Sequence, residues 1–412
     1  MVRVRFVLMF ALWPLAAQAD GNSAQWVQLM PGGGAQARVV TTAASCPAVV
    51  IDGKPVAMNA RAAPDANFSV LLCSVQIPPG AQSAAVAGET LPLAVSPPTR
   101  IAVFGDTGCR ITSNYVQACN DPTQWPFPLI AQRIADLKPD LVIHVGDYLY
   151  REAPCPAGNA ACAGSPSGDN WPAWAADFFT PAAPLLRAAP WVFVRGNHED
   201  CARGGPGWLR LLGPLAFDPA APCDAHLAPY AVPLGAMNLA VMDDADAPDQ
   251  TIESDLLAEY RSDFAALPSI AKAPVWLAMH RPIWGAVSGP MGLGVGGNRT
   301  MIAALSDPHA LDGVALMLAG HIHTFEALNY AGHAPPQLIA GFGGGNLDTT
   351  PADLSGANLS GQSVQSGLSI PGFGFLLMTR EAQGWRIDVH KVDGTIEEVC
   401  HFAGGRIDCG KA

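Results

Sequence analysis

The stretch RIAVFGD, residues 100–106, is a short apolar run that ends in a glycine and an aspartate. A second run of the same form, LVIHVGD, occupies residues 141–147. Between them, PLIAQRIADLKPD (128–140) carries apolar side chains at helical spacing and stops at Pro139. The side chains that define this spacing are Leu129, Ile130, Ile134 and Leu137. A strand, a helix and a strand in this order predict a layered α/β domain.

Three further apolar runs continue the pattern downstream. They are APWVFVRGNHED (189–200), APVWLAMHRP (273–282) and GVALMLAGHIH (313–323). Each of the five runs ends in residues that can bind a metal ion. Because the carboxyl ends of the strands meet at one edge of such a sheet, we expect these side chains to lie close together. They are Asp106, Asp147, Asn197, His198, His280, His321 and His323.

These residue types predict a site for two metal ions. Taken singly, an aspartate after a glycine is common in turns, and a lone histidine is more often a structural residue than a ligand. Together, carboxylate and imidazole groups suit zinc, iron or manganese. The candidate ligands are more numerous than one closed metal site needs, and a carboxylate can bridge two ions. Two ions suit displacement at phosphorus and lower the pKa of a water held between them.

The motifs, taken in order, resemble those of the calcineurin-like metallophosphoesterases, and more narrowly those of the purple acid phosphatases. They are GDTG (105–108), GDYLY (146–150), GNHE (196–199), MH (279–280) and GHIH (320–323). The resemblance extends from about residue 100 to the C-terminus. The superfamily usually begins with Asp-x-His, whereas Gly108 stands in the place of that histidine, as it does in the subgroup. The subgroup also has a tyrosine three residues after the second aspartate, as at Tyr150.

The resemblance assigns a role to each candidate. It implies a first metal ion, ferric iron, with the ligands Asp106, Tyr150 and His323. It implies a second, divalent ion (Fe2+, Zn2+ or Mn2+) with the ligands Asn197, His280 and His321, and Asp147 as the bridge. A phenolate ligand at Tyr150 suits a hard trivalent cation. His198 is implied to face the substrate phosphate, where it stabilises the transition state or protonates the leaving group, and Glu199 is implied to orient His198.

The resemblance also implies the fold, an α/β (α+β) metallophosphoesterase-like layered β-sandwich flanked by helices. The chain departs from the subgroup in two places. Leu277 stands where valine is frequent, and RPIWGAVSGPMG (281–292) lacks the additional substrate histidine that some members carry there. The Gly-rich stretch Trp284–Asn298 shows no strand or helix signal, so we expect a long loop beside the site or a flexible linker. IAGFGGGNLD (339–348) resembles the Gly-rich turn that follows the last motif, although an ordinary tight turn would look the same.

This interpretation predicts an enzyme that cleaves small-molecule phosphomonoesters by attack of a metal-bound hydroxide. A phosphodiesterase is the first alternative, because the same ligands serve both reactions. A non-catalytic phosphate- or metal-binding protein is the second. The complete ligand set and His198 argue against the second alternative.

The beginning of the chain predicts export. Arg3 and Arg5 precede an apolar run that starts at Phe6, and Ala17-Gln18-Ala19 has the form of a cleavage site. We therefore expect residues 1–19 to be a signal peptide and the mature protein to be periplasmic or secreted, with no membrane span. A membrane anchor is the alternative, but the apolar run is short for spanning a bilayer. The net charge of −12 and the lack of basic stretches exclude a general nucleic-acid binder.

Cysteine usage fits an oxidising compartment. The ten cysteines include no C-x-x-C pair, and an even number in an exported chain favours disulfides over a metal site. They fall as the neighbours Cys46/Cys73, Cys109/Cys119, Cys155/Cys162, Cys201/Cys223 and Cys400/Cys409, although sequence leaves the connectivity open. Pairing of Cys109 with Cys119 and of Cys201 with Cys223 would fasten loops that follow site motifs.

The rest of the chain indicates two domains. Residues 20–98 have short apolar runs without helical periodicity, which predicts a small β-rich N-terminal domain that ends in a linker at Pro97-Pro98. Residues 99–412 form the expected catalytic domain, and its turn signals at Gln383-Gly384 and Asp393-Gly394 predict antiparallel strands near the C-terminus. We expect His144 to be structural or to lie behind the ligands. No role is expected for His226, His309, His333, His390 or His401.

Overall fold

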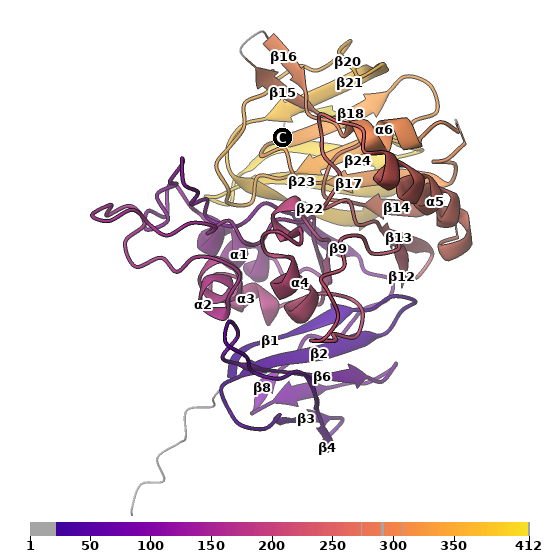
Figure 1. Ribbon diagram of the computed structural model, residues 1–412. Helices are drawn as coiled ribbons and strands as arrows, with labels where there is room; N and C mark the ends of the chain where they lie inside the picture. Colours follow the sequence, from indigo (N-terminus) through magenta and orange to yellow (C-terminus); the bar gives the residue numbers. More distant parts are fainter. Residues whose placement is uncertain (1–21, 273, 290–291, 308, 411–412) are drawn as a thin grey trace, which may run out of the picture.

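The computed structural model describes residues 22–272, 274–289, 292–307 and 309–410. The expected signal peptide, residues 1–19, lies outside them. Two large sheets pack face to face, with helices on both outer faces (Figure 1). This confirms the layered α/β sandwich that the sequence predicts. Within the described residues, no helix is long and apolar enough to cross a membrane.

Among the described residues, the first sheet has eleven strands, and its centre is parallel. The strands β9 (Arg100–Phe104), β10 (Leu141–His144) and β11 (Trp191–Phe193) are the first three predicted runs. The C-terminal side continues antiparallel, as predicted, through β22 (Gly374–Glu381), β23 (Gly384–Lys391), β24 (Ile396–Ala403) and β25 (Arg406–Gly410). The other side is completed by β1 (Asn22–Leu29), β2 (Ala35–Thr41), β6 (Leu71–Ile77) and β5 (Asn59–Ala62).

In the part of the chain that the structure describes, the second sheet has eight strands and holds the last two predicted runs. These are β14 (Val275–Ala278) and β17 (Val314–Ala319), which are parallel to each other. Their neighbours are β12 (Tyr230–Leu234), β13 (Met237–Val241), β19 (Gln337–Ala340), β18 (Phe325–Tyr330), β21 (Gln362–Ile370) and β20 (Asn358–Leu359). Apolar side chains from the inner faces of both sheets form one core between them.

Helices cover the outer faces. The first sheet is covered by α1 (Phe127–Asp136), α2 (Trp171–Trp174), the π-helical turn Ala175–Phe179, α3 (Ala183–Leu186) and α4 (Gly205–Leu211). The second is covered by α5 (Ser254–Ile270) and α6 (Arg299–Ala304). Helix α1 confirms the predicted helix and buries Ile130 and Ile134, but Leu129 is 48% exposed. Its buried face follows Phe127, Ile130 and Ile134, at spacings of three and four residues, and Leu129 lies off that line.

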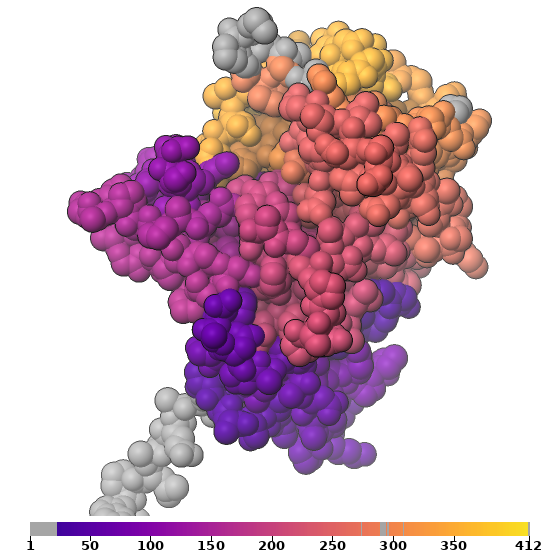
Figure 2. Space-filling view, in the orientation of Figure 1, coloured from indigo at the N-terminus to yellow at the C-terminus, as the bar shows by residue number. Residues whose placement is uncertain are grey.

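The N-terminal strands continue the first sheet. β1 pairs in parallel with β11, with Gln28 opposite Trp191, so the first sheet runs across the expected domain boundary at residue 98. A separate small sheet contains β3 (Ala48–Ile51), β4 (Lys54–Ala57), β7 (Ala84–Val86) and β8 (Glu89–Thr90). Figure 2 shows the N-terminal residues seated against the segment that contains α4.

Two arginines of the N-terminal strands bind the end of α4. Arg38 donates to the carbonyls of Leu211 and Gly213 at 2.7 and 2.9 Å. Arg61 donates to Gly213 and to two carbonyls of α4, at 3.0 Å each. Cations are favourable at a helix C-terminus, where the last carbonyls lack partners. The N-terminal strands therefore stabilise a helix that begins six residues after Glu199.

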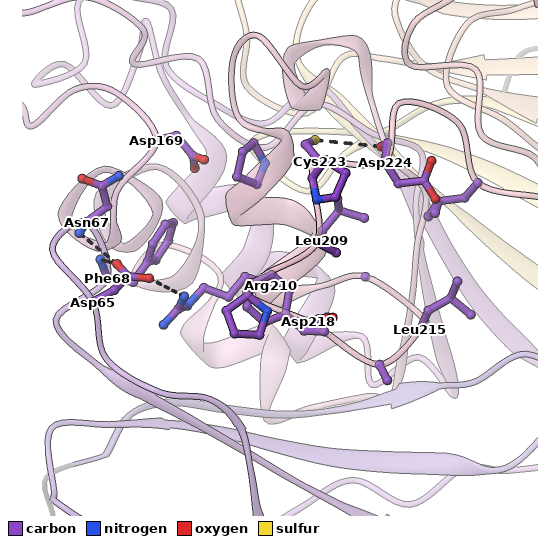
Figure 3. A pocket seen from close by; sticks show the side chains of 18 of the residues that line it. Asp65, Asn67, Phe68, Asp169, Leu209, Arg210, Leu215, Asp218, Cys223 and Asp224 are labelled. Atoms are coloured by element: carbon purple, nitrogen blue, oxygen red, sulfur yellow. Dashed lines mark hydrogen bonds and ion pairs between the residues drawn. The ribbon is translucent and has the colours of Figure 1, made fainter.

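A cavity of about 720 Å³ opens beside this junction (Figure 3). Arg210 on α4 reaches Asp65 across it at 2.6 Å, and its guanidinium lies over Phe68. Prolines and leucines of the segment 213–227 form much of the remaining wall. The expected metal ligands do not line this cavity.

The stretch Trp284–Asn298 contradicts the prediction of an irregular loop. It contains a hairpin of β15 (Ala286–Gly289) and β16 (Gly292–Val295). The glycines at its base permit close packing, because a Cβ on Gly285 or Gly296 would lie 2.4 or 2.6 Å from the Ile322 side chain. These glycines weaken the strand signal in the sequence, and the hairpin forms because it packs against the last motif.

All five neighbouring cysteine pairs are disulfides. The bonds join Cys46–Cys73, Cys109–Cys119, Cys155–Cys162, Cys201–Cys223 and Cys400–Cys409. The hypothesis for the two pairs that follow site motifs is thereby confirmed. Cys109–Cys119 closes the loop after β9, and Cys201–Cys223 closes the segment that carries α4.

Candidate metal centre

The motif residues lie together at the carboxyl ends of the five strands. Asp106, Asp147 and His321 have left-handed backbone angles, with φ of 57°, 62° and 69°. Non-glycine residues adopt this conformation rarely, and it is concentrated at functional sites. The turns direct these side chains back across the edge of the two sheets.

The first group of ligand atoms surrounds the Tyr150 hydroxyl. Ligand atoms of Asp106, Asp147 and His323 all lie within 4.8 Å of one another. Tyr150 Oη lies 2.8 Å from Asp147 Oδ2, 2.8 Å from His323 Nε2 and 3.1 Å from Asp106 Oδ1. A hydroxyl has one proton and can donate to only one of these three acceptors. The arrangement therefore favours a cation among them.

The second group surrounds Asn197. Ligand atoms of Asp147, His280 and His321 lie within 4.8 Å of one another, so Asp147 belongs to both groups. Asn197 Oδ1 lies 2.9 Å from His280 Nε2 and 2.7 Å from His321 Nδ1. Asp147 Oδ2 lies 3.2 Å from His280 Nε2. Asp147 thus has the position expected of a bridging ligand.

The hydrogen bonds of the three histidines fit metal binding. His280 Nδ1 is 2.8 Å from the Val145 carbonyl, His323 Nδ1 contacts the Asn346 carbonyl, and His321 Nε2 is 2.9 Å from Asp249 Oδ2. Each contact places the ring proton on the outer nitrogen and leaves a lone pair on the nitrogen that faces the ligand group. Metal-binding histidines are held in this way. The ligand atoms of the two groups thus fit two metal ions.

The electrostatics of the site also demand positive charge. Although burial opposes it, the Asp147 carboxylate raises the pKa of His280 to about 10. Burial, together with Asp106 and Asp147, raises the pKa of Tyr150 well above its ordinary value. Buried carboxylates without a cation thus hold protons on their neighbours, and a metal ion would displace those protons.

The Tyr150 ring explains the glycine in GDTG. A Cβ on Gly108 would lie 2.7 Å from Tyr150 Cδ2 and 2.8 Å from the Tyr148 carbonyl oxygen. Real Cβ atoms do not approach other atoms so closely, so a side chain at this position and the ring at Tyr150 exclude each other. The ring and the backbone of residues 148–150 together occupy the space that a histidine at position 108 would need.

The family comparison agrees with this geometry. The calcineurin-like phosphoesterase family model matches residues 99–325, more than half of the chain. The chain belongs to the calcineurin-like phosphoesterase family. No curated protein sequence matches the chain significantly.

Solved structures of other proteins share the fold. One is a purple acid phosphatase, PPD1 from yellow lupin (Lupinus luteus) seeds, with 14% identity and a TM-score of 0.56 over 92% of this chain and 73% of the other. Another is PhoD, with 12% identity and a TM-score of 0.58 over 97% of this chain and 94% of the other. At these identities the similarity establishes the fold only.

In this phosphoesterase, His198 contacts a carboxylate that the sequence analysis missed. His198 Nδ1 lies 2.7 Å from Glu152 Oε1. Arg203 contacts the same carboxylate oxygen at 3.4 Å and pairs with Asp200 at 2.7 Å. The His198 ring is perpendicular to the Tyr150 ring, with 4.1 Å between the centroids. The carboxylate beside His198 Nδ1 is therefore that of Glu152, whereas the resemblance implied Glu199.

Glu199 instead holds the backbone of the second motif. Its carboxylate accepts hydrogen bonds from the amides of Tyr148 and Leu149 at 2.8 and 3.0 Å, and from those of Asp147 and Gly196 at 3.1 Å each. Asp177, in the π-helical turn, likewise accepts from the amides of Cys109 and Tyr150 at 2.9 and 2.7 Å. Single-turn π-helices are frequent at functional sites.

A further carboxylate supports the second group. Asp249 Oδ2 contacts His321 Nε2 at 2.9 Å and Arg281 Nη1 at 2.6 Å. Burial alone would raise the pKa of Asp249, but His321 and Arg281 hold it well below its ordinary value. Asp249 belongs to a loop without strand or helix pattern, and no motif marks it in the sequence.

The remaining histidines lie apart from the two ligand groups. His144 is buried, and its Nε2 lies 3.0 Å from the Thr107 hydroxyl, which agrees with a structural role. His226 pairs with Asp263, and His309 with Asp312. Among the described residues, neither ligand group includes His333, His390 or His401.

Proposed function

We propose that this phosphoesterase is an exported phosphomonoesterase of the purple acid phosphatase type, with ferric iron and a divalent ion in the two ligand groups. The observation that carries the proposal is the position of Tyr150, whose hydroxyl lies within 3.1 Å of atoms of Asp106, Asp147 and His323. A phenolate favours a hard trivalent cation, and Gly108 leaves the space that the ring requires. Two metal ions, when bound, supply the Lewis acidity that activates water and stabilises the phosphoryl oxygens.

The side chains around the metal ligands would control the substrate and its protons. His198 Nε2 is 3.9 Å from Asp147 Oδ2, so the imidazole lies at the edge of the first group. With Nδ1 against Glu152, the other ring nitrogen is free to donate a proton to the leaving oxygen. Glu152 keeps the ring in this orientation, and Arg203 keeps Glu152 in place.

Hydrolysis of p-nitrophenyl phosphate, compared with its bis-ester, tests the reaction class. We expect the monoester to be the better substrate, and a preference for the bis-ester would favour the phosphodiesterase alternative. His198→Ala should lower kcat by about 100-fold while metal content stays full. His309→Ala, at an exposed histidine, is the matched control. Unchanged turnover in His198→Ala would refute the assigned role.

Export is a separate part of the proposal. Five disulfides support it, because such bonds persist in oxidising compartments. Mass spectrometry of the protein from culture medium and from a periplasmic extract should find a mature N-terminus at residue 20. Recovery of only the full-length, reduced chain inside cells would contradict export.

A further inference from the structure

Arg110 is a cation beside the metal centre that the proposed mechanism does not use. It follows the first motif, and its guanidinium carbon lies 5.8 Å from the centroid of the Tyr150 ring. His198 lies against the same ring. The guanidinium therefore lies beside the first ligand group and shares the Tyr150 ring with His198.

Arg110 differs from the other arginines near the motifs because no carboxylate of the described residues lies within ion-pair distance of it, although its charge helps to lower the pKa of Glu152. The paired arginines are Arg151 with Asp177 at 2.8 Å, Arg195 with Asp243 at 3.1 Å, Arg203 with Asp200 at 2.7 Å and Arg281 with Asp249 at 2.6 Å. Among the described residues, Arg110 forms no ion pair, although the chain has a net charge of −12. The side chain is partly exposed, so it is accessible to a ligand.

The backbone of Arg110 is held in place. Its amide donates to Gln117 Oε1 at 3.0 Å, and its carbonyl accepts from the Gln117 amide at 2.8 Å. Gln117 is buried and also donates to the Gly344 carbonyl at 2.8 Å. The Cys109–Cys119 disulfide closes the same loop. A guanidinium on a fixed backbone loses less entropy when it binds an anion.

We propose that Arg110 binds a second anionic group of the substrate, on the side where His198 meets the leaving group. This inference extends the proposed function and therefore rests on that function. The preferred substrates are then phosphomonoesters whose leaving group carries a carboxylate or a further phosphate. Guanidinium groups bind both anions through paired hydrogen bonds.

Matched substrates test the inference. The carboxylate pair is 3-phosphoglycerate and glycerol 3-phosphate, which differ by a carboxylate in place of a hydroxymethyl group. The phosphate pair is fructose 1,6-bisphosphate and fructose 1-phosphate, two phosphomonoesters of which only the first releases a leaving group that carries a phosphate. A charge-assisted hydrogen bond predicts a preference of roughly 10- to 100-fold in kcat/KM for the first member of a pair. A preference in one pair alone identifies which anion Arg110 binds.

Variants of Arg110 separate its charge from its structural contribution. Arg110→Gln should abolish the preference, lowering kcat/KM for the anionic substrate much more than for p-nitrophenyl phosphate. Arg110→Lys should keep most of the preference, since it keeps the charge. Arg133→Gln, at an exposed arginine on α1, should leave both values unchanged. A preference that survives Arg110→Gln, or that is absent from the wild-type enzyme, would overturn the inference while phosphatase activity stands.

Failure of the proposed function would look different. A wild-type protein that hydrolyses none of these esters would refute the phosphomonoesterase assignment. Calorimetric binding of the same substrate pairs to the wild type and to Arg110→Gln would then test Arg110 without turnover. Equal affinities of the two proteins for 3-phosphoglycerate and for fructose 1,6-bisphosphate would refute its role in anion binding.

Discussion

Asp249→Asn is predicted to weaken the binding of the second metal ion selectively. The substitution keeps the size of the side chain and removes the charge that lies 2.9 Å from His321 Nε2 and 2.6 Å from Arg281 Nη1. An asparagine could present its amide NH2 to His321, which would place the ring proton on the nitrogen that faces Asn197. Loss of such a partner typically weakens metal affinity about 10- to 100-fold, or roughly 1 to 3 kcal/mol.

The effect should be confined to one ion because Asp249 contacts only the second group. Among the described contacts, none joins Asp249 to Asp106, Tyr150 or His323. We therefore expect iron content and the visible spectrum to remain as in the wild type. Zinc or manganese should be lost at a lower chelator concentration.

Chelator titration followed by elemental analysis measures both occupancies in one sample. Asp246→Asn is the matched control, since it removes a carboxylate from the same loop and Asp246 contacts no expected ligand. Equal divalent affinity in Asp249→Asn and the wild type would refute the reasoning. Parallel loss of both ions would also refute it, because it would indicate general destabilisation.

Three further perturbations test other parts of the site. Gly108→Ala places a Cβ 2.7 Å from Tyr150 Cδ2, so iron binding should fall and the visible band should weaken in the absorption spectrum. Glu152→Gln should lower kcat by about 10-fold at unchanged metal content, because His198 loses its orienting partner. Burial raises the pKa of Glu326 from 4.5 to about 8. The stability that the protonated Glu326 side chain contributes is therefore complete below about pH 4.5 and is lost as the pH rises toward 8. Glu326→Gln should remove that loss and raise the unfolding free energy at pH 7 by at most about 3 kcal/mol, measured by urea denaturation at pH 5 and pH 7. An unchanged spectrum, unchanged turnover or an unchanged pH dependence, respectively, would contradict these predictions.

Sequence predicts the part of the fold that local pattern determines. The apolar runs that end at Asp106, Asp147 and Asn197 are strands, because buried parallel strands are continuously apolar. Helix 127–136 follows from its spacing, although the exposed side chain at Leu129 shows that one position was assigned to the wrong face. The hairpin at 286–295 was missed because glycine is depleted in strands, whereas here it permits packing against Ile322.

The supporting residues of the site could not be predicted in the same way. Glu152 and Asp249 lie in loops, and their roles depend on which side chains the fold places beside them. Glu199 directly follows His198 in sequence, yet its carboxylate faces the amides of the neighbouring loop. Adjacency in sequence therefore misled the assignment of the His198 partner. The contact between Arg110 and Tyr150 likewise depends on two loops that meet only in the folded chain.

Elemental analysis combined with a visible absorption spectrum tests the central claim most directly. We predict iron together with one divalent ion in the purified wild-type protein, and a broad visible band that Tyr150→Phe abolishes. Tyr148→Phe is the control, because Tyr148 is equally buried but donates its hydroxyl to the Val194 carbonyl at 2.8 Å. It should keep the band. Two zinc or manganese ions without colour, or a band that persists in Tyr150→Phe, would contradict the assignment of Tyr150 as a ligand of ferric iron.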